Sequence, residues 1–242
     1  MTDKNPNQTT QPPEKVLFYG RTLEEYIKMF DLDLDIWKKY KILDCPAGPD
    51  SFVAEAHQQG IDVVGCDPMY ANELNVLIET GNSSIEKTQE ILSDYSHLLS
   101  QKFYPSLESV KNYATQALKR FAEDYSSGRE ENRYLAACLP NLPFDNQSFD
   151  LVLSGNFLFI YSNIANKNLD TLDYEFHKNS VFELLRVGRE VRIFPIPCWS
   201  GQLNEYASKL LIDLNENGIV AEMISVEYEV FQGGNLMWRL TH

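Results

Sequence analysis

The sequence has few basic residues and no long apolar run. It carries 21 lysines and arginines against 35 aspartates and glutamates, a formal net charge of −14 at pH 7. Proteins bind nucleic-acid backbones through lysine and arginine, so this balance argues against nucleic acid as a partner. No apolar stretch approaches the roughly 20 residues of a membrane-spanning helix. We therefore expect a cytoplasmic protein with neither a nucleic-acid nor a membrane partner.

Cysteine is scarce and scattered. Cys45, Cys66, Cys138 and Cys198 form neither a C-x-x-C pair nor a cluster with histidine. This spacing predicts free thiols in a reducing compartment and no bound metal. The first 14 residues are polar and contain prolines, without the apolar centre of a signal peptide. We expect a disordered tail over residues 1–14 and a single domain over residues 15–242.

Thr22 and Glu25 have the spacing of a capping box and mark the start of an amphipathic helix. Strand and helix patterns alternate after this helix. Lys41–Asp44 is a short apolar strand that runs into a loop with two prolines and a glycine. A helix capped by Asp50 or Ser51 follows, and Ile61–Asp67 is the second strand. Strand, helix and strand in this order predict a parallel sheet.

Two helices interrupt the alternation over residues 81–128. Ser83 and Ser106 mark their starts, and Gly128 marks the end of the second. An insertion of this length is either a lid or substrate-binding element or a packed buttress. Both interpretations stay open at the level of the sequence.

The alternation then resumes and ends differently. Arg133–Ala137, Phe149–Leu153 and Glu190–Phe194 are predicted strands, and a helix that Asn217-Gly218 closes follows the last of them. The final two strands flank Gly233-Gly234, which is typical of an antiparallel hairpin. The predicted fold class is α/β: a Rossmann-like, doubly wound mixed sheet of seven strands with a C-terminal antiparallel hairpin and a helical insertion.

Two strand ends carry the residues that point to chemistry. Asp44 ends the first strand and precedes a loop of small residues and prolines, and Asp67 ends the second strand. Both lie at the carboxyl edge of a doubly wound sheet, where nucleotide-like ligands bind. A loop without bulky side chains lets a ligand approach the backbone, and an acidic side chain at Asp67 accepts hydrogen bonds from ribose hydroxyls. The pattern therefore favours a ligand that contains adenosine.

Four segments resemble motifs of the class I S-adenosylmethionine-dependent methyltransferases. They are Ile42–Pro49 (ILDCPAGP), Val64–Pro68 (VGCDP), Leu142–Val152 (LPFDNQSFDLV) and Glu183–Val187 (ELLRV). They occur in the family's order, and the resemblance covers about residues 40–240 apart from the insertion. It implies the family's fold, S-adenosylmethionine as the cofactor and methyl transfer as the activity.

The resemblance also implies roles for particular residues. The loop would hold the methionine part of the cofactor through Cys45, Pro46, Ala47 and Gly48, and Asp44 would contact its ammonium group. Asp67 would bind the ribose. The adenine would lie among Pro68, Met69, Cys138 and Leu139, and the space beside the sulfonium would be lined by Ser154, Gly155, Asn156 and Phe157.

Methyl transfer needs alignment and exclusion of water more than it needs a base. Asn156, Tyr161 and His177 are candidate catalytic residues, each with an alternative role in local packing or hydrogen bonding. Tyr19 is a candidate to line an aromatic pocket. Arg21 is either a partner of the cofactor carboxylate or a solvated side chain.

Two other functions remain open. A nicotinamide-dependent oxidoreductase shares the acidic end of the second strand but has G-x-G-x-x-G after the first, where this chain has only Gly48. A non-catalytic binding module on the same fold is the other alternative. The function we expect is methyl transfer from S-adenosylmethionine to a small molecule, and the sequence leaves the oligomeric state open.

Overall fold

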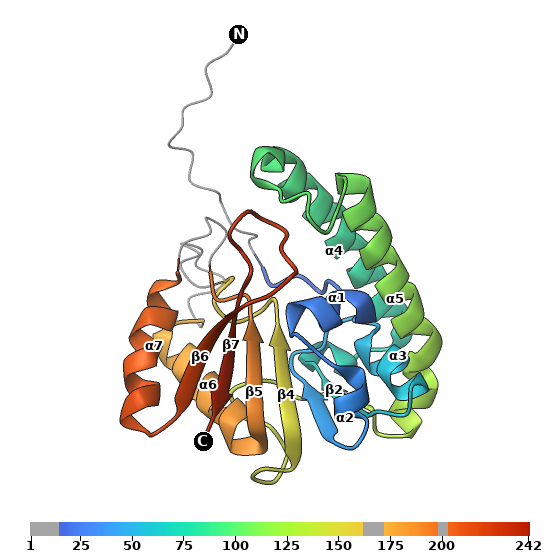
Figure 1. Ribbon diagram of the computed structural model, residues 1–242. Coiled ribbons are helices and arrows are strands. Elements are labelled where there is room, and N and C mark those ends of the chain that lie inside the picture. The colour runs from blue at the N-terminus through green and yellow to red at the C-terminus, as the bar shows by residue number, and fades with distance from the viewer. Residues whose placement is uncertain (1–14, 162–171, 198–202) are drawn as a thin grey trace.

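A seven-stranded sheet organises the molecule (Figure 1). The computed structural model describes residues 15–161, 172–197 and 203–242, so the predicted tail and Cys198 lie outside the described residues. The strand order is β3-β2-β1-β4-β5-β7-β6. The strands are β1 (Lys41–Asp44), β2 (Asp62–Cys66), β3 (Tyr134–Leu135), β4 (Phe149–Gly155), β5 (Gly188–Phe194), β6 (Val220–Ser225) and β7 (Leu236–Thr241).

The sheet is mixed. Strands β1 to β5 pair in parallel, whereas β7 pairs antiparallel with both β5 and β6. The order reverses between β1 and β4, which is the point where a doubly wound sheet opens a crevice at its carboxyl edge. The predicted Rossmann-like fold with a C-terminal antiparallel hairpin is confirmed.

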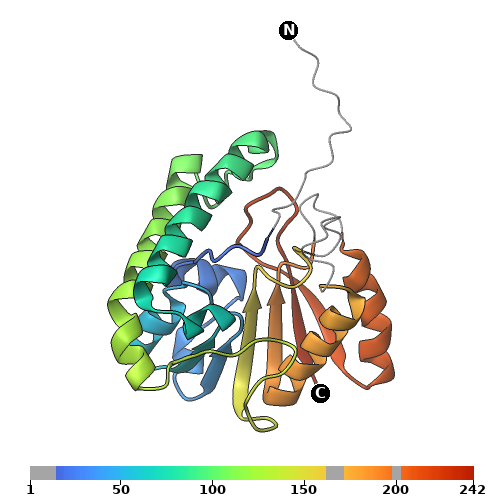
Figure 2. The same ribbon diagram turned by 180° about the vertical axis from the view of Figure 1, so that it is seen from behind.

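Helices cover both faces of the sheet (Figures 1 and 2). Along β1, Ile42 belongs to one buried cluster and Leu43 to the other, as strand periodicity requires. The first face packs against α1, α3, α4 and α5, and the second against α6 and α7. The helices are α1 (Leu23–Met29), α2 (Leu34–Trp37), α3 (Phe52–Gln58), α4 (Leu74–Asp94), α5 (Leu107–Glu130), α6 (Tyr174–Val187) and α7 (Glu205–Glu216), with 3-10 turns η1 (Pro68–Ala71) and η2 (Ser96–Leu98).

Several helix ends follow the sequence signals. Thr22 and Glu25 form the predicted capping box of α1. Ser106 caps α5 with Ser109 as its reciprocal partner. After α7, Gly218 has a φ of +75°, the left-handed conformation that glycine adopts at a helix C-terminus.

Other predicted boundaries were wrong. Ser83 lies inside α4, and Gly128 lies inside α5 and does not end it. A Cβ at Gly128 would overlap the ring of Tyr134 on β3, so close packing explains this glycine. Asp33 caps the short helix α2, which the sequence patterns did not predict.

The insertion helices reach beyond the carboxyl edge of the sheet, beside the loop between β6 and β7 (Figures 1 and 2). Backbone hydrogen bonds join the insertion to this loop. The Ser100 N–H donates to the Val230 carbonyl over 2.8 Å, and the Gln232 N–H donates to the Leu98 carbonyl over 3.0 Å. The insertion therefore forms a wall above the strand ends.

Within the described ranges, no helix has the length and apolar character required to cross a bilayer. The same ranges hold no group of three or more histidine, cysteine, aspartate or glutamate side chains arranged for a metal ion.

Candidate functional site

Two buried carboxyl groups lie behind the loop that follows β1. The phenol oxygen of Tyr26 lies 2.9 Å from Asp44 Oδ2 and also bonds Asp50. Burial raises the pKa of both aspartates well above the usual range, and Asp50 raises that of Asp44 further. A single phenol hydrogen serves only one of these contacts, so the cluster holds a carboxyl proton. Asp50 neither caps α3 nor points into open space.

The N-terminal segment, residues 17–21, covers this loop. The Ser51 N–H donates to the Arg21 carbonyl over 3.0 Å, and the Arg21 N–H donates to the Asp50 carboxylate. A Cβ at Gly20 would overlap the carbonyl oxygen of Pro49. The segment is therefore held to the loop by backbone contacts that leave no room for a side chain.

Asp67, at the end of β2, orders the backbone on both sides of it. One carboxylate oxygen accepts the Gly48 N–H over 3.1 Å, and the other accepts the Met69 N–H over 2.8 Å. Burial raises the pKa of Asp67 to about 6, although these two hydrogen bonds oppose the shift. Each oxygen retains a lone pair, because a carboxylate offers about four acceptor sites.

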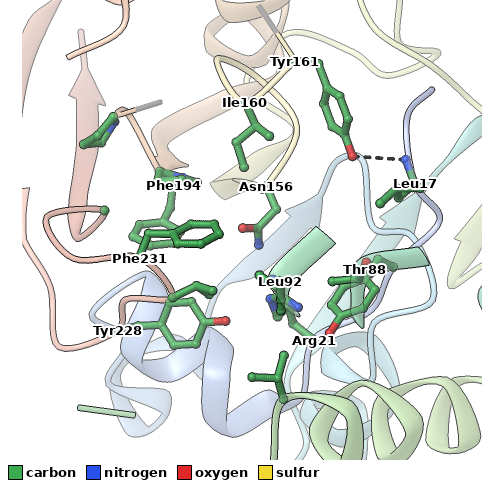
Figure 3. Close-up of a pocket in the computed structure, with 16 residues that line it drawn as sticks. Leu17, Arg21, Thr88, Leu92, Asn156, Ile160, Tyr161, Phe194, Tyr228 and Phe231 are labelled. Carbon is green, nitrogen blue, oxygen red and sulfur yellow. Dashed lines mark hydrogen bonds between the residues drawn. The ribbon is translucent and has the colours of Figure 1, made fainter. Parts of the chain in front are cut away.

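A cavity of about 110 Å³ opens beyond the end of β4 (Figure 3). Its described wall is mostly apolar and aromatic, and Arg21 is the one charged residue in that part of it. This volume is below the roughly 300 Å³ at which drug-sized ligand pockets begin. The wall comprises Leu17, Tyr19, Arg21, Thr88, Leu92, Val110, Asn156, Ile160, Tyr161, Phe194, Pro195, Pro197, Tyr228, Val230, Phe231 and Gly234.

Two of the candidate catalytic residues reach this cavity. Asn156 has a φ of +52°, and its side chain lies at the cavity in Figure 3. The Tyr161 hydroxyl accepts the Leu17 N–H over 3.1 Å and thereby joins the N-terminal segment to the end of β4. Burial raises the pKa of Tyr161.

His177 does not lie in the cavity wall. It is buried between Phe159 and Tyr206, and its Nδ1 lies 2.7 Å from the Asp173 carbonyl. Burial lowers its pKa, which favours the neutral ring. His177 packs helix α6, apart from the cavity that the other two candidates reach.

The residues predicted for the cofactor fall into three groups. Asp44, Cys45 and Ala47 are buried in the first strand and its loop, while Pro46 and Gly48 are half-buried. Met69 is half-buried beside exposed Pro68, and exposed Cys138 adjoins buried Leu139. Ser154 is buried with no hydrogen-bond partner for its hydroxyl among the described residues, and Gly155, Asn156 and Phe157 are half-buried.

The sequence did not reveal most of the cavity wall. Tyr228 and Phe231 lie in the long loop between β6 and β7. Their aromatic side chains beside Gly233-Gly234 were the available signal. Thr88, Leu92 and Val110 come from the insertion, whose position above the sheet no local pattern specifies.

One protein of known sequence is similar over nearly the whole chain. The uncharacterized protein MJ0045 of Methanocaldococcus jannaschii is 30% identical over 217 residues, which are 89% of this chain and 91% of that protein. No protein-family model matches the chain.

Solved structures are similar only at low identity. The protein PH0226 of Pyrococcus horikoshii is 14% identical, with a TM-score of 0.43 over 90% of this chain and 88% of that one. A SAM-dependent methyltransferase of Aquifex aeolicus is 12% identical, with a TM-score of 0.39 over 89% and 90%. Magnesium protoporphyrin IX methyltransferase of Synechocystis, with bound SAM, is 14% identical, with a TM-score of 0.40 over 84% and 70%. The fold assignment rests on the strand order.

Proposed function

We propose that this chain, which belongs to the same family as the uncharacterized Methanocaldococcus jannaschii protein MJ0045, transfers a methyl group from S-adenosylmethionine to a small molecule. One observation carries the proposal. Asp67 and the Gly48 loop meet at the carboxyl edge of the sheet, and a cavity adjoins the neighbouring end of β4. The motif resemblance of these segments supplies the cofactor's identity.

The residues at this edge fit such a cofactor. Gly48 has a φ of +54°, and among the described residues beyond its chain neighbours a Cβ there would meet only the Tyr19 carbonyl, at 3.8 Å. Asp67 keeps acceptor capacity for ribose hydroxyls. Tyr19 and Arg21, both in the cavity wall, each have a buried polar atom that lacks a partner among the described residues. The methyltransferase resemblance assigns Asp44 to the ammonium group of the cofactor. Here Tyr26 donates a hydrogen bond to the Asp44 carboxyl group instead.

The bound cofactor would supply an electrophilic methyl group on a sulfonium that leaves as a neutral thioether. The chain's own part is to align the acceptor and exclude water. Asn156 and Tyr161 lie where they would orient an acceptor in the cavity, and the apolar wall would keep water out. An acceptor that carries a proton on its nucleophile would lose it as the bond to the methyl group forms.

The affinity for S-adenosylhomocysteine tests the proposal. We expect wild-type protein to bind it with micromolar affinity, and Asp67→Ala to weaken binding by about 10- to 100-fold, because hydrogen bonds to a charged group are lost. Isothermal titration measures both constants. Asp62→Ala removes an exposed aspartate from the start of the same strand and is the matched control.

Failure would take one of two forms. If folded wild-type protein binds neither S-adenosylmethionine nor S-adenosylhomocysteine, the proposed function is excluded and a non-catalytic module on this fold is favoured. If it binds nicotinamide dinucleotide instead, the oxidoreductase alternative is favoured.

Binding should also depend on pH. Ribose hydroxyls donate to the ionised form of Asp67, whose pKa is about 6 in the free protein. Affinity is therefore expected to fall as pH decreases below about 6, approaching about tenfold per pH unit. The ligand's own α-amino and α-carboxyl groups titrate outside pH 5–7. Titrations at pH 5, 6 and 7 measure this, and Asp67→Asn should remove the dependence. A dependence that persists in Asp67→Asn would assign it to another group.

A further inference from the structure

Arg21 lies in the cavity wall with its hydrogen-bonding capacity incompletely used. Its side chain is 11% exposed, and Nε lies 3.5 Å from Glu25 Oε1. This separation exceeds the 2.7–3.2 Å of an N–H···O hydrogen bond, and Nε has no hydrogen-bond partner among the described residues. The guanidinium carbon sits 4.6 Å from the centre of the Tyr19 ring. Arginine keeps its charge at any working pH, so this unsatisfied N–H belongs to a largely buried cation.

Glu25 is fully engaged by other donors. Its Oε2 accepts the Thr22 N–H over 2.7 Å and the Thr22 hydroxyl over 3.0 Å. Its Oε1 accepts the Tyr104 hydroxyl and lies 3.2 Å from the Tyr228 hydroxyl. Glu25 therefore balances the charge of Arg21 without satisfying its N–H groups.

The side chain of Arg21 lies in the described wall of the cavity. Tyr228 from the hairpin loop lies in the same wall, and Tyr104 from the insertion bonds Glu25 beside it. Figure 3 shows the Tyr228 hydroxyl directed toward Arg21, with Asn156 across the cavity. The Tyr19 hydroxyl is also buried without a partner among the described residues. Unsatisfied donors thus lie in a wall that is otherwise mostly apolar.

We propose that this cavity binds a small organic anion with an apolar, ring-sized body, and that Arg21 pairs with its carboxylate. Planar guanidinium groups match carboxylates in a bidentate geometry. The rings of Phe194, Tyr228 and Phe231 supply apolar surface for the body of the ligand. The identification of this ligand as the methyl acceptor rests on the proposed function. Binding of the anion itself requires no cofactor.

The test compares benzoate with benzamide, which has the same ring and no charge. Wild-type protein is expected to bind benzoate at least tenfold more tightly, measured by isothermal titration without cofactor. Arg21→Gln should remove this preference and leave benzamide binding unchanged. Arg21→Lys should retain part of it, since a point charge replaces the planar fork. Lys28→Gln removes a positive charge from the same N-terminal region, in α1 on the side that faces Glu227, and should change neither affinity.

Several outcomes would overturn the proposal. They are no binding of either probe, equal binding of both by wild-type protein, or a preference that survives Arg21→Gln. The comparison in wild-type protein needs no variant, so a folding defect in a variant does not leave the proposal undecided.

Arg21 has two possible partners, the carboxylate of the acceptor and the carboxylate of S-adenosylmethionine. Measuring the affinity for the cofactor distinguishes them. If Arg21→Gln weakens S-adenosylmethionine by tenfold or more and leaves decarboxylated S-adenosylmethionine unchanged, Arg21 serves the cofactor and the acceptor assignment is wrong. If wild-type protein binds benzoate as expected but neither form of the cofactor, the anion site stands and the methyltransferase proposal fails.

Discussion

Replacing Tyr26 by phenylalanine is expected to lower the free energy of unfolding by about 3 kcal/mol at pH 7.5. The Tyr26 hydroxyl is the hydrogen-bond partner that joins the buried carboxyl groups of Asp44 and Asp50. Without it, Asp44 loses the only side chain of the described chain found bonded to its carboxyl group. Chemical denaturation monitored by fluorescence measures the loss.

The effect should depend on pH with a definite sign. The folded-state pKa of both aspartates is raised by burial, so the native state binds protons that the unfolded chain releases above about pH 4. Stability from this cluster is therefore complete at low pH and is lost as pH rises toward the folded-state values. The defect of Tyr26→Phe should shrink at pH 5, where a second proton neutralises the carboxylate that has lost the Tyr26 donor.

A surface variant serves as the control. Tyr113→Phe removes a hydroxyl that bonds exposed Glu24 over 3.0 Å, and we expect a change within about 0.5 kcal/mol. A Tyr26→Phe defect no larger than this, or one that grows toward pH 5, would contradict the shared-proton description of the cluster.

Replacing Gly20 by alanine is expected to cost about 3 kcal/mol, at the upper end of overpacking effects. The new Cβ would overlap the main-chain carbonyl of Pro49, and a backbone atom cannot turn aside as a side chain does. The N-terminal segment should shift from the loop, which would open the cavity wall at Leu17, Tyr19 and Arg21. Thermal unfolding and limited proteolysis near residue 20 measure the two effects.

Gly218→Ala provides a contrast. Gly218 has a φ of +75°, and no atom of the described residues other than its chain neighbours lies within 4 Å of the position that a Cβ would take there. Only the backbone conformation therefore opposes alanine, at a cost of about 1 kcal/mol. Equal losses in the two variants, with residues 17–21 still protected from proteases, would show that the contact between Gly20 and Pro49 is not tight.

Local patterns predicted the sheet well. The apolar run at Lys41–Asp44 matches β1 at both ends, and the glycine pair in the C-terminal part lies in the loop that joins two antiparallel strands. Such features depend on periodicity and turn chemistry within a few residues. The placement of Asp67 at a strand end followed in the same way.

Tertiary contacts explain what the sequence did not reveal. Gly128 looked like a helix terminator, because its packing against Tyr134 depends on how α5 lies over β3. The contact of Tyr26 with Asp44 depends on how α1 crosses the sheet. The described wall of the cavity combines six separated stretches of chain, so no single motif predicts it.

The pairing of Glu25 with Tyr228 also bears on the order of folding. These residues are 203 positions apart, and chains are synthesised from the N-terminus at about 5–20 residues per second. On a growing chain, Glu25 therefore waits for this partner until the 203 residues that follow it have been synthesised. Contacts of such long range also slow folding, because the loop between them must close first. This contact of the Glu25 carboxylate is thus available only once Tyr228 has been added, so a chain truncated before Tyr228 would leave the carboxylate without one of its partners.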